Sequence, residues 1–202
     1  MFRIINFQIL IKFLVGLTVF FSIATYAAIL HFWPTTSIFK LSAISSAVAA
    51  FLIFLIGNNS ISRKIWATIK FFDGSLFPDI NGAWRGEITY PGGRLAARAI
   101  IRQNISHTQI DLHTPTSKSI TIESTPVSES GQCRLYYVHR VTPKNPDWQV
   151  YTGSTIFDIR YVDVDGKKIL ELSGYYYTDR KTNGRIKLRQ IGNDYSKDIS
   201  YY

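Results

Sequence analysis

Two long apolar runs are followed by a region of short alternating segments. The first run, residues 13–33, contains one histidine, His31, and no Asp, Glu, Lys or Arg; the second, residues 41–57, contains none of these five types. A helix rises about 1.5 Å per residue and a bilayer core is about 30 Å thick, so the first run is long enough to span it. The second run is near the short limit and spans the bilayer core if Ile38 and Phe39 are counted. We predict a transmembrane helical hairpin over residues 1–57, with spans at about 13–33 and 39–57.

Two other interpretations of the apolar runs fit less well. A secretory signal core is normally shorter than the first run, and a second apolar run does not normally follow it at once. Surface helices of soluble domains have a polar face, which neither run shows. We therefore prefer the transmembrane hairpin to a signal peptide cleaved near Ala27-Ala28 and to two buried core helices.

The basic residues predict the orientation of this hairpin. The loop between the runs carries only Lys40, whereas Arg3, Lys12, Arg63, Lys64 and Lys70 flank the runs on their other sides. The positive-inside rule then places both termini in the cytoplasm, with Trp33 and Trp66 near the membrane surfaces. The single cysteine, Cys133, agrees with a reducing compartment because it allows no disulfide within the chain.

From Ile80 onward the pattern changes to short runs separated by Gly, Pro, Asn and Asp. Residues 58–78 form a polar connector, and residues 79–202 form a separate β-rich domain. Its predicted strands cover 84–90, 94–103, 107–114, 117–125, 134–141, 148–162, 168–178 and 184–191. Eight antiparallel strands with short turns predict a closed up-and-down barrel, which leaves no exposed edge. A β-sandwich is the alternative fold.

Charge and motifs exclude several functions. The chain has 23 Lys and Arg against 14 Asp and Glu, but from Asp79 onward the counts are 17 and 13. This mild surplus argues against a DNA- or RNA-binding domain, which normally carries a dense basic face. No metal-type spacing, nucleophile motif or phosphate-binding glycine loop is present. We therefore expect a protein that is not an enzyme and has no cofactor, metal or catalytic residue.

The densest group of candidate binding residues lies in the seventh predicted strand. Alternation places Tyr176, Thr178 and Arg180 on the face that begins with Leu172, if the strand continues that far. An arginine offers a planar fork to phosphate oxygens, and a tyrosine offers a stacking face and a hydroxyl. On spacing alone, a buried tyrosine beside an arginine at the solvent rim is the simpler interpretation.

Other strands contribute candidates to the same barrel mouth. Tyr137 and His139 share a face with Leu135 on the fifth strand. Gln103 ends the second strand, and Ser117 and Ser119 begin the fourth. Each of these, taken singly, is also an ordinary barrel position.

The order of motifs resembles a known family. A hairpin precedes the pattern Phe77-Pro78-Asp79-Ile80-x-Gly82-x-Trp84-x-Gly86, and the domain closes with Leu172-x-Gly174-x-Tyr176-x-Thr178-x-Arg180 and Gly184-x-Ile186-x-Leu188. This order is similar to the two-transmembrane β-barrel effectors of CBASS, the bacterial cyclic-oligonucleotide anti-phage systems. Ile101-x-Gln103, Ser117-x-Ser119, Leu135-x-Tyr137 and Gly153 also match. At residues 104–107 the chain departs from the family, which often has a Trp after the Gln.

The resemblance implies a receptor for a cyclic dinucleotide that a partner nucleotidyltransferase makes. Ligand binding would make the cytoplasmic barrels oligomerise, and the clustered hairpins would disrupt the bacterial inner membrane and kill the infected cell. By position, the resemblance assigns ligand contacts first to Tyr137, Tyr176, Thr178 and Arg180, and then to Gln103, Ser117 and Ser119.

Two other functions remain open on the sequence. A small barrel on a membrane anchor could hold a lipid as a lipocalin does. It could also act as an envelope scaffold with a filled interior. Ligand titration separates the three functions, because only the first requires a cyclic dinucleotide.

Overall fold

The structure is a computed structural model of the 202-residue chain. It describes residues 7–32, 37–58, 60–61, 63–64, 67–68, 77–104, 107–129, 131–196 and 199–201. Two compact units divide between residues 74 and 75, within the predicted connector. Trp33, Trp66 and residues 69–76 of that connector lie outside the described residues.

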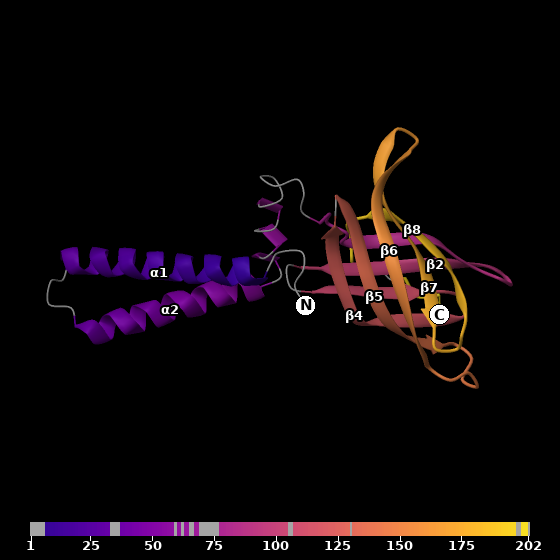
Figure 1. The fold of residues 1–202 in the computed structure, drawn as a ribbon, viewed down its shortest axis with the longest axis horizontal. Helices are drawn as coiled ribbons and strands as arrows, with labels where there is room; N and C mark the ends of the chain where they lie inside the picture. Colours follow the sequence, from indigo (N-terminus) through magenta and orange to yellow (C-terminus); the bar gives the residue numbers. More distant parts are fainter. Residues whose placement is uncertain are drawn as a thin grey trace. The chain divides into compact units, whose positions relative to one another are not determined.

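The first unit contains two helices that run side by side in opposite directions (Figure 1). These are α1 (Phe7–Phe32) and α2 (Ile38–Gly57). Within the described residues, Val15–Phe32 of α1 is the stretch long and apolar enough to cross a membrane, with a mean hydropathy of 1.8. The apolar part of α2, Ser42–Leu55, is shorter. Length and composition thus support one spanning helix, and the predicted second span has only a shorter apolar helix in its place.

The second unit is a closed barrel of eight antiparallel strands, each hydrogen-bonded to its neighbours in sequence, with the last strand pairing with the first. The predicted barrel is confirmed, and closure excludes the β-sandwich. The strands are β1 (Gly82–Tyr90), β2 (Gly93–Gln103), β3 (Thr108–His113), β4 (Ser117–Glu129), β5 (Gln132–Pro143), β6 (Tyr151–Val164), β7 (Lys167–Thr178) and β8 (Asn183–Gly192).

The sixth strand begins later than predicted. A turn precedes it, in which the side chain of Asn145 accepts from the Asp147 amide at 3.0 Å and its carbonyl accepts from the Trp148 amide at 3.1 Å. These bonds hold Trp148 out of the ladder, so β6 starts at Tyr151. The aromatic side chain at 148 therefore belongs to the β5–β6 loop.

Strand alternation builds the core, because every second side chain points into the barrel. On β5, buried and exposed side chains alternate. Leu135, Tyr137 and His139 are buried, and Tyr136, Val138 and Arg140 are exposed. The shared face predicted for Leu135, Tyr137 and His139 is thus the inward face of the strand. The apolar interior includes Ala97, Ala99, Ile101, Ile110, Leu135, Phe157, Leu172 and Leu188.

One end of the barrel is filled by the segment that leads into β1. Phe77, Ile80 and Trp84 are each 0% exposed, and the Trp84 indole Nε1 donates to the Ile80 carbonyl at 2.9 Å. Asn81 accepts from the Gln103 amide at 2.7 Å and donates to the Gln103 carbonyl at 2.9 Å. Much of the motif between Phe77 and Gly86 therefore closes this end of the barrel, which we call the closed end.

Gly86 in the same motif permits close strand packing. A Cβ at Gly86 would lie 1.8 Å from the Lys187 carbonyl oxygen on β8, a distance that no side chain tolerates. Glycine therefore lets β1 and β8 approach where the barrel closes.

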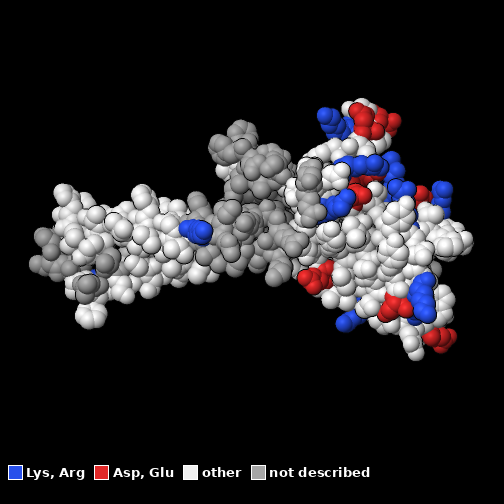
Figure 2. Space-filling view, in the orientation of Figure 1, with Lys and Arg blue, Asp and Glu red and all other residues white. Residues whose placement is uncertain are grey.

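Charged side chains cover the outer wall in mixed sign, as the visible face in Figure 2 shows. Glu171, whose side chain is 1% exposed, lies among three cations: Arg160 at 2.7 Å, Arg189 at 2.9 Å and Lys187 at 3.3 Å. Burial of Glu171 alone would raise its pKa, but hydrogen bonds from Arg160, Arg189 and Lys187 outweigh it and hold the pKa below its ordinary value. This cluster ties β6, β7 and β8 together.

Candidate ligand-binding site

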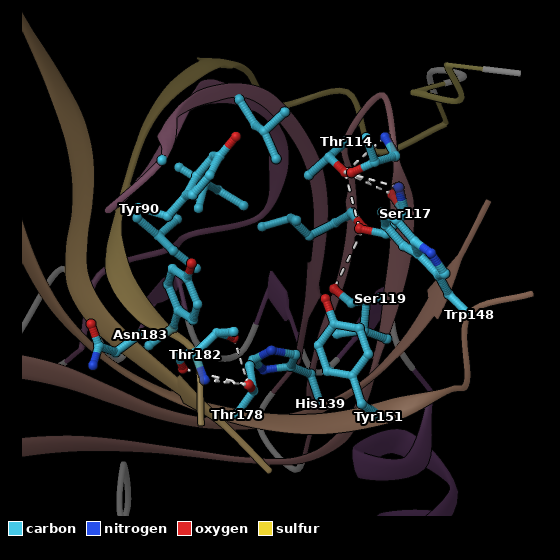
Figure 3. Close-up of a pocket in the computed structure, with 18 of the residues that line it drawn as sticks. Tyr90, Thr114, Ser117, Ser119, His139, Trp148, Tyr151, Thr178, Thr182 and Asn183 are labelled. Atoms are coloured by element: carbon cyan, nitrogen blue, oxygen red, sulfur yellow. Dashed lines mark hydrogen bonds between the residues drawn. The ribbon is translucent and has the colours of Figure 1, made fainter. Parts of the chain in front are cut away.

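A cavity of about 650 Å³ lies in the barrel at the end opposite to the closed end. Its lining includes residues from the β1–β2, β3–β4 and β7–β8 turns and from the β5–β6 loop. We call this end the mouth. Its volume falls within the range of small-molecule sites. Figure 3 shows the lining side chains converging from these four connections on a common space.

The floor of the cavity is an aromatic pair on β5. The rings of Tyr137 and His139 stack with centroids 4.6 Å apart and planes 19° apart, and Phe157 lies behind Tyr137 at 6.2 Å. The Tyr137 hydroxyl donates to the Ile110 carbonyl at 3.2 Å. Burial raises the pKa of Tyr137 far above its ordinary value, so the phenol stays neutral.

His139 is also neutral at physiological pH. Its side chain is buried, and this burial lowers its pKa to about 4, against a smaller opposing effect of the Tyr137 backbone carbonyl. The ring therefore provides a hydrogen-bonding edge and no charge.

One wall of the cavity carries hydroxyl groups from the β3–β4 turn. The Thr114 Oγ1 accepts from the Ser117 amide at 3.0 Å and lies 3.0 Å from the Ser117 hydroxyl. Further down, the Ser119 hydroxyl lies 3.4 Å from that of Tyr137. The turn thus aligns a column of small polar groups from the rim to the floor, and hydroxyls both donate and accept.

Aromatic side chains surround the rim: Tyr90, Trp148, Tyr151 and Tyr176. Tyr176 fits because the facing β8 residue is Gly184, where a Cβ would lie 2.6 Å from its ring. Burial raises the pKa of both Tyr151 and Tyr176. The rim therefore offers several neutral flat surfaces on which a planar group can stack.

Two residues of the β7–β8 turn hold the start of β6 and the loop before it. Asp179 accepts from the Thr152 amide at 2.9 Å and from the Thr152 hydroxyl at 2.8 Å, and the Thr152 backbone bond is the main cause of its lowered pKa. The Arg180 guanidinium donates to the Gln149 carbonyl and lies 4.3 Å over the Tyr151 ring. These contacts fix Tyr151 at the cavity edge.

The structure brings five of the seven predicted site residues to the cavity. Tyr137, Tyr176, Thr178, Ser117 and Ser119 all line it. Their roles as ligand contacts stay predictions.

The other two predicted residues lie elsewhere. Strand β7 ends at Thr178, so the alternation stops before Arg180, which lies in the turn beside the rim and outside the lining. Gln103 lies at the closed end, where its Oε1 accepts from the Ile80 amide at 2.9 Å. Strand β7 begins at the closed end and ends at the mouth, and β2 runs in the opposite direction. Gln103 at the end of β2 therefore cannot share the mouth with Thr178.

Several lining residues had no strong signal in the sequence. Tyr90, Thr114, Trp148, Tyr151 and Lys181 lie in or next to connections at the mouth. Once the strands are known to form a meander, the ends of the odd-numbered strands identify this group. Among the residues that the structure describes, Lys181 is the charged member of the lining, and no group of three His, Cys, Asp or Glu side chains could hold a metal ion.

No curated protein and no solved structure matches this chain. The family model described as "Cap15, cyclic dinucleotide receptor domain" matches residues 75–190, which is more than half of the chain and includes most of the barrel. The family resemblance predicted from the motifs is therefore confirmed, and the chain belongs to the Cap15 family of CBASS effectors, with a cyclic dinucleotide receptor barrel.

Proposed function

We propose that this chain is an anti-phage effector whose barrel binds a cyclic dinucleotide in the cavity at the mouth. Binding then drives copies of the chain to assemble, and the assembled helices disrupt the bacterial inner membrane. The observation that carries the proposal is the aromatic-lined cavity of about 650 Å³ within the matched receptor domain.

The lining suits the chemistry of such a ligand. A cyclic dinucleotide has two flat bases and two negative charges. Tyr90, Trp148 and Tyr176 offer stacking surfaces, and stacking of a base on an aromatic side chain is worth about 1–3 kcal/mol. Lys181 in the lining and Arg180 beside it supply positive charge at the rim. Aliphatic side chains also line the cavity, so titration with fatty acids decides between this proposal and the lipid-binding alternative.

Ligand-driven assembly requires a difference in ligand affinity between assembled and free barrels, and it does not require a change in the fold of the barrel. If the assembled barrels bind the ligand more tightly than free barrels do, the ligand shifts the equilibrium toward assembly. The α1 helix, with its apolar stretch Val15–Phe32, supplies a membrane anchor, and anchored copies already share a plane at high effective concentration. The basic residues around the apolar runs favour a cytoplasmic barrel, where the product of a partner nucleotidyltransferase would reach it.

Binding is tested by calorimetry on the full chain in detergent. A panel of cyclic dinucleotides is titrated, with fatty acids as a second arm. We expect at least one cyclic dinucleotide to bind and Tyr176→Ala to weaken that binding about tenfold or more, because Tyr176 lines the cavity. Tyr177→Ala is the matched control, since the adjacent side chain is 59% exposed on the outer wall and lies outside the lining. Binding of fatty acids alone would contradict the proposal.

Assembly and membrane disruption are tested separately. We expect the ligand to raise the mass of the detergent-solubilised chain in light scattering, and to release dye from liposomes that contain it. Tyr176→Ala should need more ligand for both effects. Dye release without any change in mass would contradict the assembly step and leave the binding step intact.

A further inference from the structure

A row of basic side chains crosses the outer wall of the barrel. Arg98 of β2 pairs with Arg85 of β1, and Arg85 pairs with Arg189 of β8. Glu171 of β7 continues the row, and it pairs with Arg160 of β6. Lys187 lies on the same face of β8, two residues before the arginine of the row. We call the five cations of this surface the basic band: Arg85, Arg98, Arg160, Lys187 and Arg189.

The carboxylates around the band do not balance its charge. Glu171 is a single carboxylate, and three cations of the band share it. The neighbouring Glu87 and Asp158 form ion pairs with arginines outside the band. Among the residues that the structure describes, Arg85 and Arg98 form no ion pair, and the Arg98 guanidinium lies 4.2 Å over the Tyr201 ring. The band therefore carries five cations against one carboxylate.

Three of the arginines occupy successive paired positions. Paired residues on one face of a sheet have their Cβ atoms about 4.5–5.5 Å apart, and like charges at such positions destabilise the sheet. Arg98, Arg85 and Arg189 follow one another in this way with no acidic residue between them. The other half of the row contains Glu171, which relieves the same repulsion. An anionic partner outside the chain would relieve it at the three arginines.

The band has the form of a surface contact. Its side chains stay in reach of a partner, since Arg160 is 56%, Arg189 44% and Lys187 42% exposed. None of the five cations lines the cavity at the mouth. Small-molecule sites are concave, whereas the outer wall of a barrel is convex. Cations spread over several strands of a convex wall match an extended anionic surface, such as a bilayer with anionic headgroups.

The band lies near the end of the barrel from which the chain continues toward the helices. Arg85 follows Gly82, the first residue of β1, by three residues. Arg189 precedes Gly192, the last residue of β8, by three residues. A strand rises about 3.3 Å per residue, so both arginines lie about 10 Å from the closed end. The segment before β1 also leaves from this end, and α1 with its apolar stretch precedes it in the chain.

We propose that the basic band binds anionic lipid headgroups and holds this side of the barrel wall against the membrane. The mouth lies at the other end of the same strands and stays open to the ligand. A basic side chain close to an anionic bilayer strengthens binding about fivefold, so the five cations act together. This inference rests on the membrane anchor of the proposed function and does not depend on the ligand.

Lysine footprinting of the full chain in nanodiscs tests the contact. Discs of phosphatidylcholine are compared with discs that also contain phosphatidylglycerol, and mass spectrometry follows acylation of each lysine by a water-soluble reagent. We expect Lys187 to react about fivefold more slowly on the anionic discs, and the difference to disappear at high salt. Lys118 is the internal control, because it is exposed on β4, on the opposite side of the closed barrel, and should react equally on both discs.

A pair of variants tests whether charge causes the protection. Arg85→Gln combined with Arg98→Gln removes two cations that form no ion pair among the described residues, so the barrel should keep its fold. We expect the difference in Lys187 reactivity between the two discs to fall to about twofold or less. Arg140→Gln is the matched control, since this arginine is exposed on the outer wall of β5 and lies outside the band.

The outcomes separate this inference from the proposed function. Equal reactivity of Lys187 on the two discs would overturn the proposal, and so would full protection in the double variant. Protection by a DNA duplex in detergent, without protection on anionic discs, would assign the band to nucleic acid and overturn it as well. A chain that does not enter the discs contradicts the membrane anchor and this inference together. Cyclic dinucleotide binding, measured by calorimetry in detergent, is unaffected by any of these results.

Discussion

The two ends of the barrel use the same strands for different purposes. At the closed end, Phe77, Ile80 and Trp84 fill the interior completely, each at 0% exposure. At the mouth, inward positions carry Tyr, Ser, Thr and His around a cavity of about 650 Å³. An eight-stranded barrel is just wide enough to be filled by side chains or to hold one small ligand. This barrel is filled by side chains at the closed end and has a cavity at the mouth, and the residues near each strand end determine the difference.

The comparison explains why the family motif has two parts. The segment from Phe77 to Trp84 contributes stability, because it closes one end. In the later motif, Leu172 belongs to the core while Tyr176 and Thr178 line the cavity. One strand therefore passes from a structural region to a binding region over six residues. Substitutions at the closed end should mainly lower the stability of the barrel, whereas substitutions at the mouth should mainly lower ligand affinity.

The largest expected effect is at the closed end. Trp84→Ala removes a fully buried indole and its bond to Ile80, which should destabilise the barrel by about 3–5 kcal/mol. Thermal unfolding of the detergent-solubilised chain, followed by circular dichroism, measures the change. An unchanged unfolding midpoint would show that packing at the closed end contributes little to the stability of the barrel.

The next effect belongs to the mouth and depends on pH. Because the folded pKa of His139 is about 4 and the ordinary value is 6.5, the unfolded chain binds the proton more readily. The stability contribution of the neutral ring is complete above pH 6.5. It is lost as the pH falls from 6.5 to about 4, by roughly 3 kcal/mol at about 1.4 kcal/mol per pKa unit.

The control for this pH effect is His139→Phe, which cannot titrate. Its unfolding midpoint should change less than that of the wild-type chain over the same pH interval. Equal pH profiles for the two proteins would place the acid sensitivity in other groups, and the mouth would then lack the buried neutral imidazole that distinguishes it from the closed end.

A smaller effect is expected on the outer wall, which is common to both ends. Glu171→Gln leaves Arg160, Lys187 and Arg189 without their carboxylate and should cost about 1–2 kcal/mol, because these cations are partly exposed. The folded pKa of Glu171 is lowered, so its contribution is present above the ordinary value of 4.5 and is lost as the pH falls through the folded value. Denaturation curves of the wild-type and Glu171→Gln proteins should therefore differ at neutral pH and converge at pH below the folded pKa of Glu171.

The smallest effect on stability is expected for Trp148→Ala in the β5–β6 loop. This side chain is 54% exposed, so its removal should change the free energy of unfolding by no more than about 0.5 kcal/mol. Ligand affinity should nevertheless fall, because Trp148 lines the cavity. A loss of stability comparable to that of Trp84→Ala would remove the distinction between the two ends.

The sequence by itself determined the barrel and much of the pocket wall. Alternating side chains and turn residues predicted eight strands in a meander. Alternation placed Tyr176 inside, and Tyr137 and Ser119 were candidates for the mouth that they do line. Because the meander was already predicted, the position of Gln103 could have been found as well. The second strand must end opposite to the seventh, so Gln103 and Thr178 lie at different ends.

Other features were decided only by the tertiary structure. Alternation tells which face a side chain occupies, but it ends with the strand, and so the sequence could not place Arg180 against Gln149 and Tyr151 in the turn. The burial of His139 likewise depends on Gly153 of the neighbouring strand and on Tyr137 beside it. Local pattern fixes the direction of a side chain, whereas depth, charge state and partners arise from residues that only the closed barrel brings together.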